Sequence, residues 1–185
     1  MAIKRMTING FASLELNRVS APISGRVIAD LDLDGFVEGI NDPAENGMIL
    51  AYNYATGKVT LPSGSDATFG LHYSTEKEYY THEVGLNKFK LFEGGFKPRL
   101  LIPAVGDRFT TNAIAYDDTE FATEAALETA LEGIATTPLF GVPCANGGIK
   151  VTATAGTGSL ILRVAKYTTV PNGDVGVKFD VIKGQ

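Results

Sequence analysis

The sequence predicts a mainly β protein with one α-helix, in which antiparallel strands form a sandwich or barrel-like sheets. Short runs rich in β-branched and aromatic residues recur along the 185 residues, separated by Gly, Asn and Pro. Several runs alternate apolar and polar side chains, which is the period of a strand with one buried face. One acidic segment, near residues 118–132, instead has the spacing of an amphipathic helix.

The composition predicts an ordered chain with a buried core. Hydrophobic residues make up 44% of the sequence, and folding at this size typically removes roughly 70% of the unfolded surface from water. Cys144 is the only cysteine, so no disulfide can form within the chain. We expect a β-rich lobe over 1–116, with an N-terminal arm over 1–19, and a helix with C-terminal β-hairpins over 117–185. One continuous domain is the alternative.

The N-terminal segment allows two interpretations. Its apolar side chains, among them Ile3, Met6 and Phe11, can contact a neighbouring subunit by strand addition or as apolar anchors. Alternatively, the segment forms an ordinary first strand pair around a turn at Asn9-Gly10.

Residues 30–35, DLDLDG, match the first six positions of a calcium-binding loop. Asp30, Asp32 and Asp34 would supply the first ligands. The twelfth position is Asn41, however, so the bidentate carboxylate is missing, and no amphipathic helix flanks the segment. We therefore favour a strand with an acidic exterior over a calcium site, and we predict no metal.

The remaining strands follow from alternation and turn chemistry. Tight turns are expected at Asn46-Gly47 and Thr56-Gly57, and at 62–64, 155–158 and 171–174, where Gly or Asn provides a positive φ. The expected strands are 48–53, 58–61, 67–74, 99–102, 108–116, 149–154, 159–167 and 175–181. The almost continuously apolar strand 159–167 is expected to be central, covered on both faces, and paired in a hairpin with 149–154.

The helix is expected to begin at Asp117, which would act as N-cap with Glu120 three residues later, and to end at a left-handed Gly133. Its apolar stripe is Leu127, Ala130, Leu131 and Ile134. Glu124, Glu128 and Glu132 follow each other at intervals of four residues, so this face is either solvated or docked onto a basic partner.

The search for catalytic and cofactor sites predicts none. His72 and His82 are the only histidines, and the alternation of strand 67–74 places His72 on a polar, surface face. Cys144, between Pro143 and Ala145, is expected to be a buried, inert thiol. The turn at 156–159 lacks both the third glycine of a dinucleotide site and the ending of a P-loop. We therefore expect no enzyme and no cofactor.

Charge and hydropathy also restrict the partners. The net charge is −5, and the most basic stretch, around Lys88, Lys90, Lys97 and Arg99, is flanked by glutamates, so nucleic acid is not an expected partner. No window approaches the 18 continuous apolar residues of a membrane span, and no signal peptide is recognised. Synthesis in the cytoplasm is expected.

Three motifs carry a resemblance to a known family: NGMILAYNYATGKVTLPSG, LHYSTEKEYYTHEVGLNKFKLFEGGFKPRL and LIPAVGDRFTTNAIAYDD, which cover residues 46–118. They resemble capsid decoration, or cement, proteins of tailed bacteriophages. The resemblance implies a non-enzymatic virion protein that is made in the host cytoplasm and binds and stabilises the major capsid protein lattice. Self-association is a further expected mode. The acidic balance favours the outer capsid surface, away from packaged DNA.

A second function class stays open. A carbohydrate- or receptor-binding module on the particle surface would use exposed aromatic rings, and Tyr52, Tyr79 and Tyr80 are the candidates. Tyr79 and Tyr80 are also candidate partner contacts of a cement protein.

Overall fold

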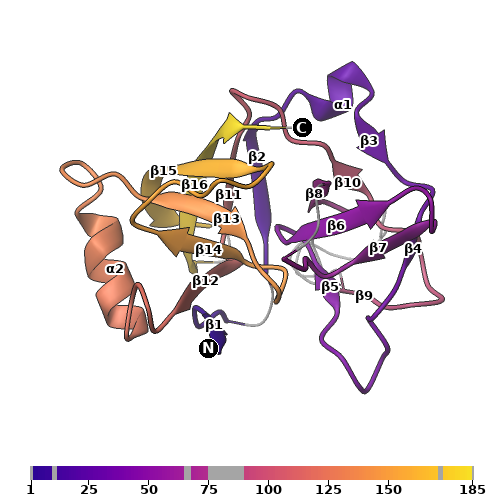
Figure 1. Ribbon diagram of the computed structural model, residues 1–185, viewed down its shortest axis with the longest axis horizontal. Coiled ribbons are helices and arrows are strands. Elements are labelled where there is room, and N and C mark those ends of the chain that lie inside the picture. Colours follow the sequence, from indigo (N-terminus) through magenta and orange to yellow (C-terminus); the bar gives the residue numbers. More distant parts are fainter. Residues whose placement is uncertain (1, 10–11, 65–67, 75–89, 171–172, 185) are drawn as a thin grey trace.

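The computed structural model describes residues 2–9, 12–64, 68–74, 90–170 and 173–184. Two β-sheets lie side by side, and a helix lies against the larger one (Figure 1). The strands are β1 (Ile3–Arg5), β2 (Leu14–Arg18), β3 (Val27–Ile28), β4 (Asp32–Leu33), β5 (Ala44–Glu45), β6 (Ile49–Asn53), β7 (Lys58–Thr60), β8 (Phe69–His72), β9 (Lys90–Leu91), β10 (Leu100–Leu101), β11 (Arg108–Thr111), β12 (Ile114–Asp117), β13 (Phe140–Pro143), β14 (Ile149–Thr152), β15 (Ile161–Thr169) and β16 (Val175–Lys183). The helices are α1 (Ala21–Ser24) and α2 (Glu124–Glu132). The predicted mainly β class is confirmed.

The larger sheet has eight strands in the order β1-β12-β14-β13-β15-β16-β11-β2 and curls into a half-barrel. The short N-terminal strands pair within their own chain, β1 with β12 and β2 with β11. They do not pair with each other, which corrects the expected first strand pair around Asn9-Gly10. Strands from both 1–116 and 117–185 therefore share this sheet. How the chain divides into domains stays a prediction.

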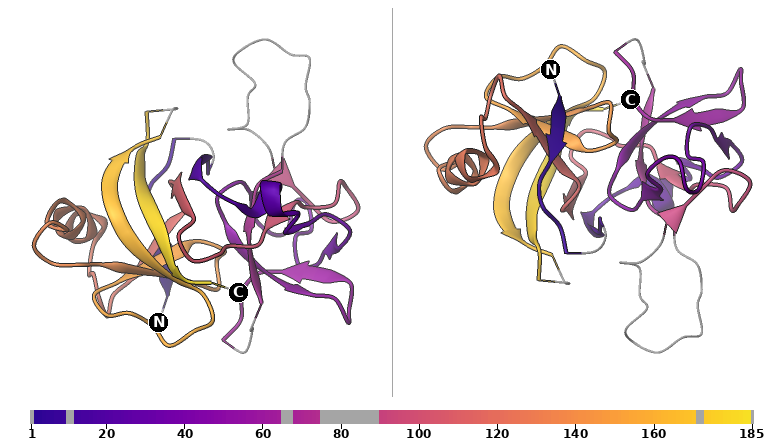
Figure 2. Two further views of the ribbon diagram at one scale, coloured as in Figure 1. Left: turned by 90° about the horizontal axis from the view of Figure 1, so that it is seen from above. Right: turned by 90° about the horizontal axis from the view of Figure 1, so that it is seen from below.

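The smaller sheet has six strands in the order β3-β10-β8-β6-β7-β4, and β5 pairs separately with β9. The two faces of the six-stranded sheet contact two different apolar cores, as expected because successive residues of a strand point to opposite faces. Ile49 and Ala51 of β6 belong to the core that the two sheets share, whereas Leu50 belongs to the core on the opposite face. Figure 2 shows the two sheets from above and below.

The expected hairpin of 149–154 with 159–167 is wrong. β13 lies between β14 and β15 and pairs with both, although no strand was expected over its residues. Gly141 lets the strand fit there, because a Cβ at this position would approach Ile149 Cγ2 to 2.6 Å. β15 is central as predicted, but it is covered on one face only: Leu162 and Val164 are buried, whereas Arg163 is exposed.

The predicted helix α2 is confirmed, but its N-cap lies six residues after Asp117, the expected N-cap. The N-cap is Thr123, whose Oγ1 accepts a hydrogen bond from Ala126 N at 3.2 Å. Asp117 is instead the last residue of β12, and its carboxylate accepts hydrogen bonds from the backbone N–H and the hydroxyl of Thr119. Gly133 follows the helix with a φ of −83°, so it is not left-handed as predicted.

The buried side of α2 agrees with the predicted stripe, since Leu127 and Leu131 belong to the shared core. The short helix α1 was not predicted. It has Pro22 in its first turn and a left-handed Gly25 after its end, both of which are recognised helix boundary signals.

Candidate functional site

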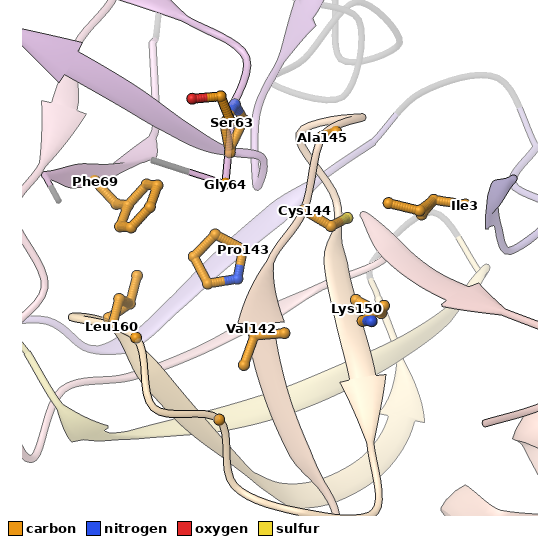
Figure 3. A pocket seen from close by; sticks show the side chains of 13 residues that line it. Ile3, Ser63, Gly64, Phe69, Val142, Pro143, Cys144, Ala145, Lys150 and Leu160 are labelled. Atoms are coloured by element: carbon orange, nitrogen blue, oxygen red, sulfur yellow. The ribbon is translucent and has the colours of Figure 1, made fainter. Parts of the chain in front are cut away.

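A pocket with a volume of about 440 Å³ lies between the two sheets. Phe69 of the smaller sheet and Val142 and Pro143 of the larger one line it, and Figure 3 shows these side chains with Leu160 and Cys144. Further lining residues are Ile3, Pro62, Ser63, Gly64, Ala145, Lys150, Gly156 and Gly158. The lining is mostly apolar, as in sites that bind by shape and burial.

Cys144 is buried in the pocket wall. Its Sγ lies 2.9 Å from Asn146 Oδ1 and 3.1 Å from Gly148 O, to which it can donate. Burial raises the pKa of the thiol to about 11, so the nucleophilic thiolate is scarce at neutral pH. The prediction of a buried thiol is confirmed.

Lys150 and Asp117 supply the charges near this pocket. Lys150 Nζ donates to Asp117 Oδ2 at 2.9 Å, and Thr119 Oγ1 donates to Asp117 Oδ1 at 2.7 Å. The hydrogen bond from Thr119 and then the one from Lys150 lower the pKa of Asp117 to about 2. An ionised carboxylate that is already paired is a poor proton donor or acceptor near neutral pH. The geometry suits binding of an apolar group better than acid–base chemistry.

His72 is fully buried, which corrects the prediction of a surface histidine. Residues that precede β6 cover this face of β8: the His72 ring lies 2.8 Å from Glu45 O and 2.8 Å from Ser74 Oγ. A carbonyl oxygen only accepts, so Nδ1 carries the proton and Nε2 accepts from Ser74. Burial lowers the pKa of His72 to about 4, and the imidazole is neutral at pH 7.

The three aspartates of the calcium candidate, Asp30, Asp32 and Asp34, are exposed. Lys97 Nζ forms an ion pair with Asp32 Oδ1 at 2.9 Å and also donates to the carbonyl of Asp30 at 2.7 Å. Within the described ranges, no group of three or more His, Cys, Asp or Glu side chains is placed to hold a metal ion. A lysine therefore occupies the place where a cation would be expected.

The candidate partner contacts have different positions. Ile3 is partly buried in β1 and lines the pocket between the sheets. Met6 is buried in the shared core, so it is not available as an exposed anchor. Phe11, Tyr79 and Tyr80 lie outside the described residues. Tyr52 is partly buried, and its ring meets that of the exposed Tyr54 edge-on with 5.8 Å between centroids.

Two loops of the smaller sheet expose large apolar side chains, which we call the apolar rim: Val37, Ile40 and Phe96. Ile40 is 79% and Phe96 is 65% exposed. The carboxylate of Glu93 joins the two loops, because it accepts hydrogen bonds from the backbone N–H groups of Gly35 and Phe36. Glu93 N in turn donates to Phe36 O at 3.0 Å. The rim is therefore held in place before any partner binds.

The fold also assembles a basic surface that the sequence did not reveal. Adjacent strands β2, β11, β16 and β15 carry five cationic side chains on the outer face of the larger sheet, which we call the basic face: Arg18, Arg108, Arg163, Lys166 and Lys178. These residues are up to 160 positions apart in the sequence, so no local run of charge indicates them. Only the strand pairing brings them together.

The comparisons with known proteins identify no relative: no family model, curated protein or solved structure matches this chain. In the part of the chain that the structure describes, no helix is both long and apolar enough to span a membrane.

Proposed function

We propose that this chain is a non-enzymatic structural protein of a tailed bacteriophage particle, which binds the outer surface of the capsid lattice and stabilises it. The apolar rim is the observation that carries the proposal. Exposed apolar side chains on braced loops are suited to protein contacts, because little conformational entropy is lost when such loops bind. Phe96 lies within the motifs that resemble decoration proteins, in the run LFEGGFKPRL.

The chemistry of the pocket between the sheets agrees with a role in binding. Its thiol is protonated, and its ammonium group, on Lys150, is paired with the carboxylate of Asp117 beside the pocket. A lattice protein needs neither a nucleophile nor a proton carrier. Many copies on one shell can also act together, so a modest interface in each copy is sufficient.

The test is co-sedimentation with purified capsid shells that lack the protein. We expect the wild-type chain to sediment with the shells at a fixed ratio to the major capsid protein and to raise the temperature at which the shells rupture. Phe96→Asp and Ile40→Asp should each weaken binding by about tenfold or more, since a carboxylate would be desolvated at the contact.

Ile23→Asp is the matched control, because Ile23 is an exposed isoleucine on α1 rather than on the rim. It should bind shells like the wild type. The proposal is wrong if the wild-type chain stays in the supernatant, or if it binds without protecting the shells against heat.

A polar pocket beside Tyr52 favours a second candidate, a carbohydrate- or receptor-binding module. The pocket has a volume of about 270 Å³ and is lined by Asp34, Asn53, Thr56, Lys58 and Thr60 as well as Ala51 and Tyr52. Hydroxyl, amide and charged groups near an aromatic ring are common in sugar sites. A module of this kind would be sparse on the particle and would bind glycans or cell wall in a pull-down, whereas a cement protein would be abundant and would not.

A further inference from the structure

The basic face is arranged in two rows across the strands. One row contains Arg18, Arg108, Asp180 and Arg163, and the next contains Glu15, Thr110, Lys178 and Lys166. Five cationic side chains thus meet two carboxylates, in a chain whose net charge is −5. This face is strongly basic on an otherwise acidic molecule.

Asp180 fixes the two guanidinium groups of its row. Arg108 Nε lies 2.5 Å from Asp180 Oδ1, and Arg163 Nη2 lies 3.1 Å from Asp180 Oδ2. One buried carboxylate therefore orients two arginines and neutralises only one of them. The remaining N–H donors are held in position for another acceptor.

The second row is electrostatically unfavourable in a single copy. Lys166 and Lys178 are direct cross-strand partners, and like charges at such positions repel. Among the described residues, neither lysine takes part in an ion pair. An acidic partner would relieve this repulsion.

Helix α2 carries an excess of negative charge, opposite to that of the basic face. It carries Glu124, Glu128 and Glu132 and has no basic residue in its last turn. The carboxylate of Glu124 accepts hydrogen bonds from the backbone N–H and the hydroxyl of Thr7. Glu132 is exposed at the C-terminal end of the helix, where the helix dipole disfavours a negative charge. Glu128 is half-buried, and its Oε1 lies 3.4 Å from the hydroxyl of Tyr167.

A chain cannot place its own α2 on its own basic face. Leu127 and Leu131 hold the helix to the core, and Val164 and Phe179 face the same core from β15 and β16. The basic side chains lie on the other side of these strands, because neighbouring residues of a strand point to opposite faces.

The spacing of the two surfaces matches between copies. Glu128 and Glu132 are about 6 Å apart along a helix that rises about 1.5 Å per residue. The two basic rows are two residues apart on β16, which is about 6.6–6.8 Å along a strand. We propose that the basic face binds the acidic side of helix α2 of a second copy of this chain.

Nucleic acid fits this surface less well. Asp180 and Glu15 lie within the two rows, and the net negative charge of the chain repels a phosphate backbone. A protein surface with separate carboxylates can instead approach Lys166 and Arg163 while it avoids Asp180. The self-association is independent of the proposed binding to capsids, and it can be measured on the purified chain alone.

The experiment is sedimentation velocity of the full chain over a range of concentrations, in about 20 mM and about 500 mM sodium chloride. We expect association at low salt and its loss at high salt, where charges are screened over a few ångströms. Lys166→Glu alone and Glu132→Lys alone should each weaken association by about tenfold or more. An equimolar mixture of these two variants should restore it, because the reversed charges are again complementary.

Lys58→Glu and Glu38→Lys are the matched controls, since they make the same charge changes away from both surfaces. They should associate like the wild type, and all variants should keep the wild-type circular dichroism spectrum. A wild type that stays monomeric at low salt overturns the proposal, and so does a mixture that does not recover. Retention of duplex DNA by the wild type, with loss in Lys166→Glu and no self-association, would assign the face to nucleic acid instead.

Discussion

The imidazole of His72 lies between two fixed partners, the carbonyl of Glu45 and the hydroxyl of Ser74. Arg99 N also donates to Ser74 Oγ, at 2.9 Å, so the hydroxyl proton is left for the imidazole. Protonation of Nε2 would replace an accepted hydrogen bond by two facing donors. The cost of charging a buried ring is what lowers its pKa.

We expect the stability of the chain to fall in mild acid because of this residue. The pKa of His72 is about 4 in the folded chain and 6.5 in the unfolded one, so the unfolded state takes up the proton first. The contribution is intact above pH 6.5 and declines as the pH falls towards 4. About 2 kcal/mol should be lost by pH 5 and about 3 kcal/mol in full.

Urea unfolding at pH 7 and pH 5 checks this expectation. His72→Gln should be less stable than the wild type at pH 7, because its amide does not reproduce both hydrogen bonds. It should also lose about 2 kcal/mol less between the two pH values than the wild type does. Equal losses in the two proteins would contradict the assignment.

Local patterns predicted those strands whose partners are close in the sequence. The hairpin of β6 and β7 follows from its alternation and from the turn at Gly57, which has a φ of 71°. β13 was missed because Gly141 and Pro143 resemble loop residues, and its pairing with β15 is a contact over more than twenty positions.

The candidate sites were likewise predictable only where they depend on residues close in the sequence. The burial of Cys144 was predictable from its immediate neighbours, whereas the burial of His72 depends on a segment 27 residues away. The apolar rim combines two distant loops, and the basic face combines strands from both ends of the chain. Charges that alternate with apolar residues in β15 and β16 are the one local signal of the basic face.

The start of α2 provides a further test. Thr123→Ala should lower the free energy of unfolding by about 1 kcal/mol, because Ala126 N loses its acceptor. Thr129→Ala is the control within the same helix. Its hydroxyl only bonds back to Ala125 O, and alanine is the better helix former, so this variant should be as stable as the wild type or slightly more stable. Equal losses in the two variants, measured by urea titration, would remove Thr123 as the cap.

The two sheets are connected by more than their adjacent position. They share one core, and Ile49 N of β6 donates to Gly147 O in the turn before β14 at 2.8 Å. Leu162 belongs to the shared core, and Leu50 belongs to the core behind the smaller sheet. Both cores contact the same central strand, β6.

We therefore expect the chain to unfold in one cooperative transition. Leu162→Ala and Leu50→Ala should each destabilise it by about 2–5 kcal/mol, and each should move the whole transition to lower temperature. Differential scanning calorimetry measures both effects. Two separate transitions, with each variant shifting only one of them, would show that the sheets unfold independently.

The position of β16 between β11 and β15 has a consequence for how the chain acquires its structure. Arg108 pairs with Asp180, while β2 near the start of the chain pairs with β11. The half-barrel therefore cannot be completed on the ribosome before β16 has been synthesised. Pairing strands that lie so far apart in the sequence requires the closure of long loops, which is slow. We therefore expect the chain to fold in milliseconds to seconds rather than microseconds.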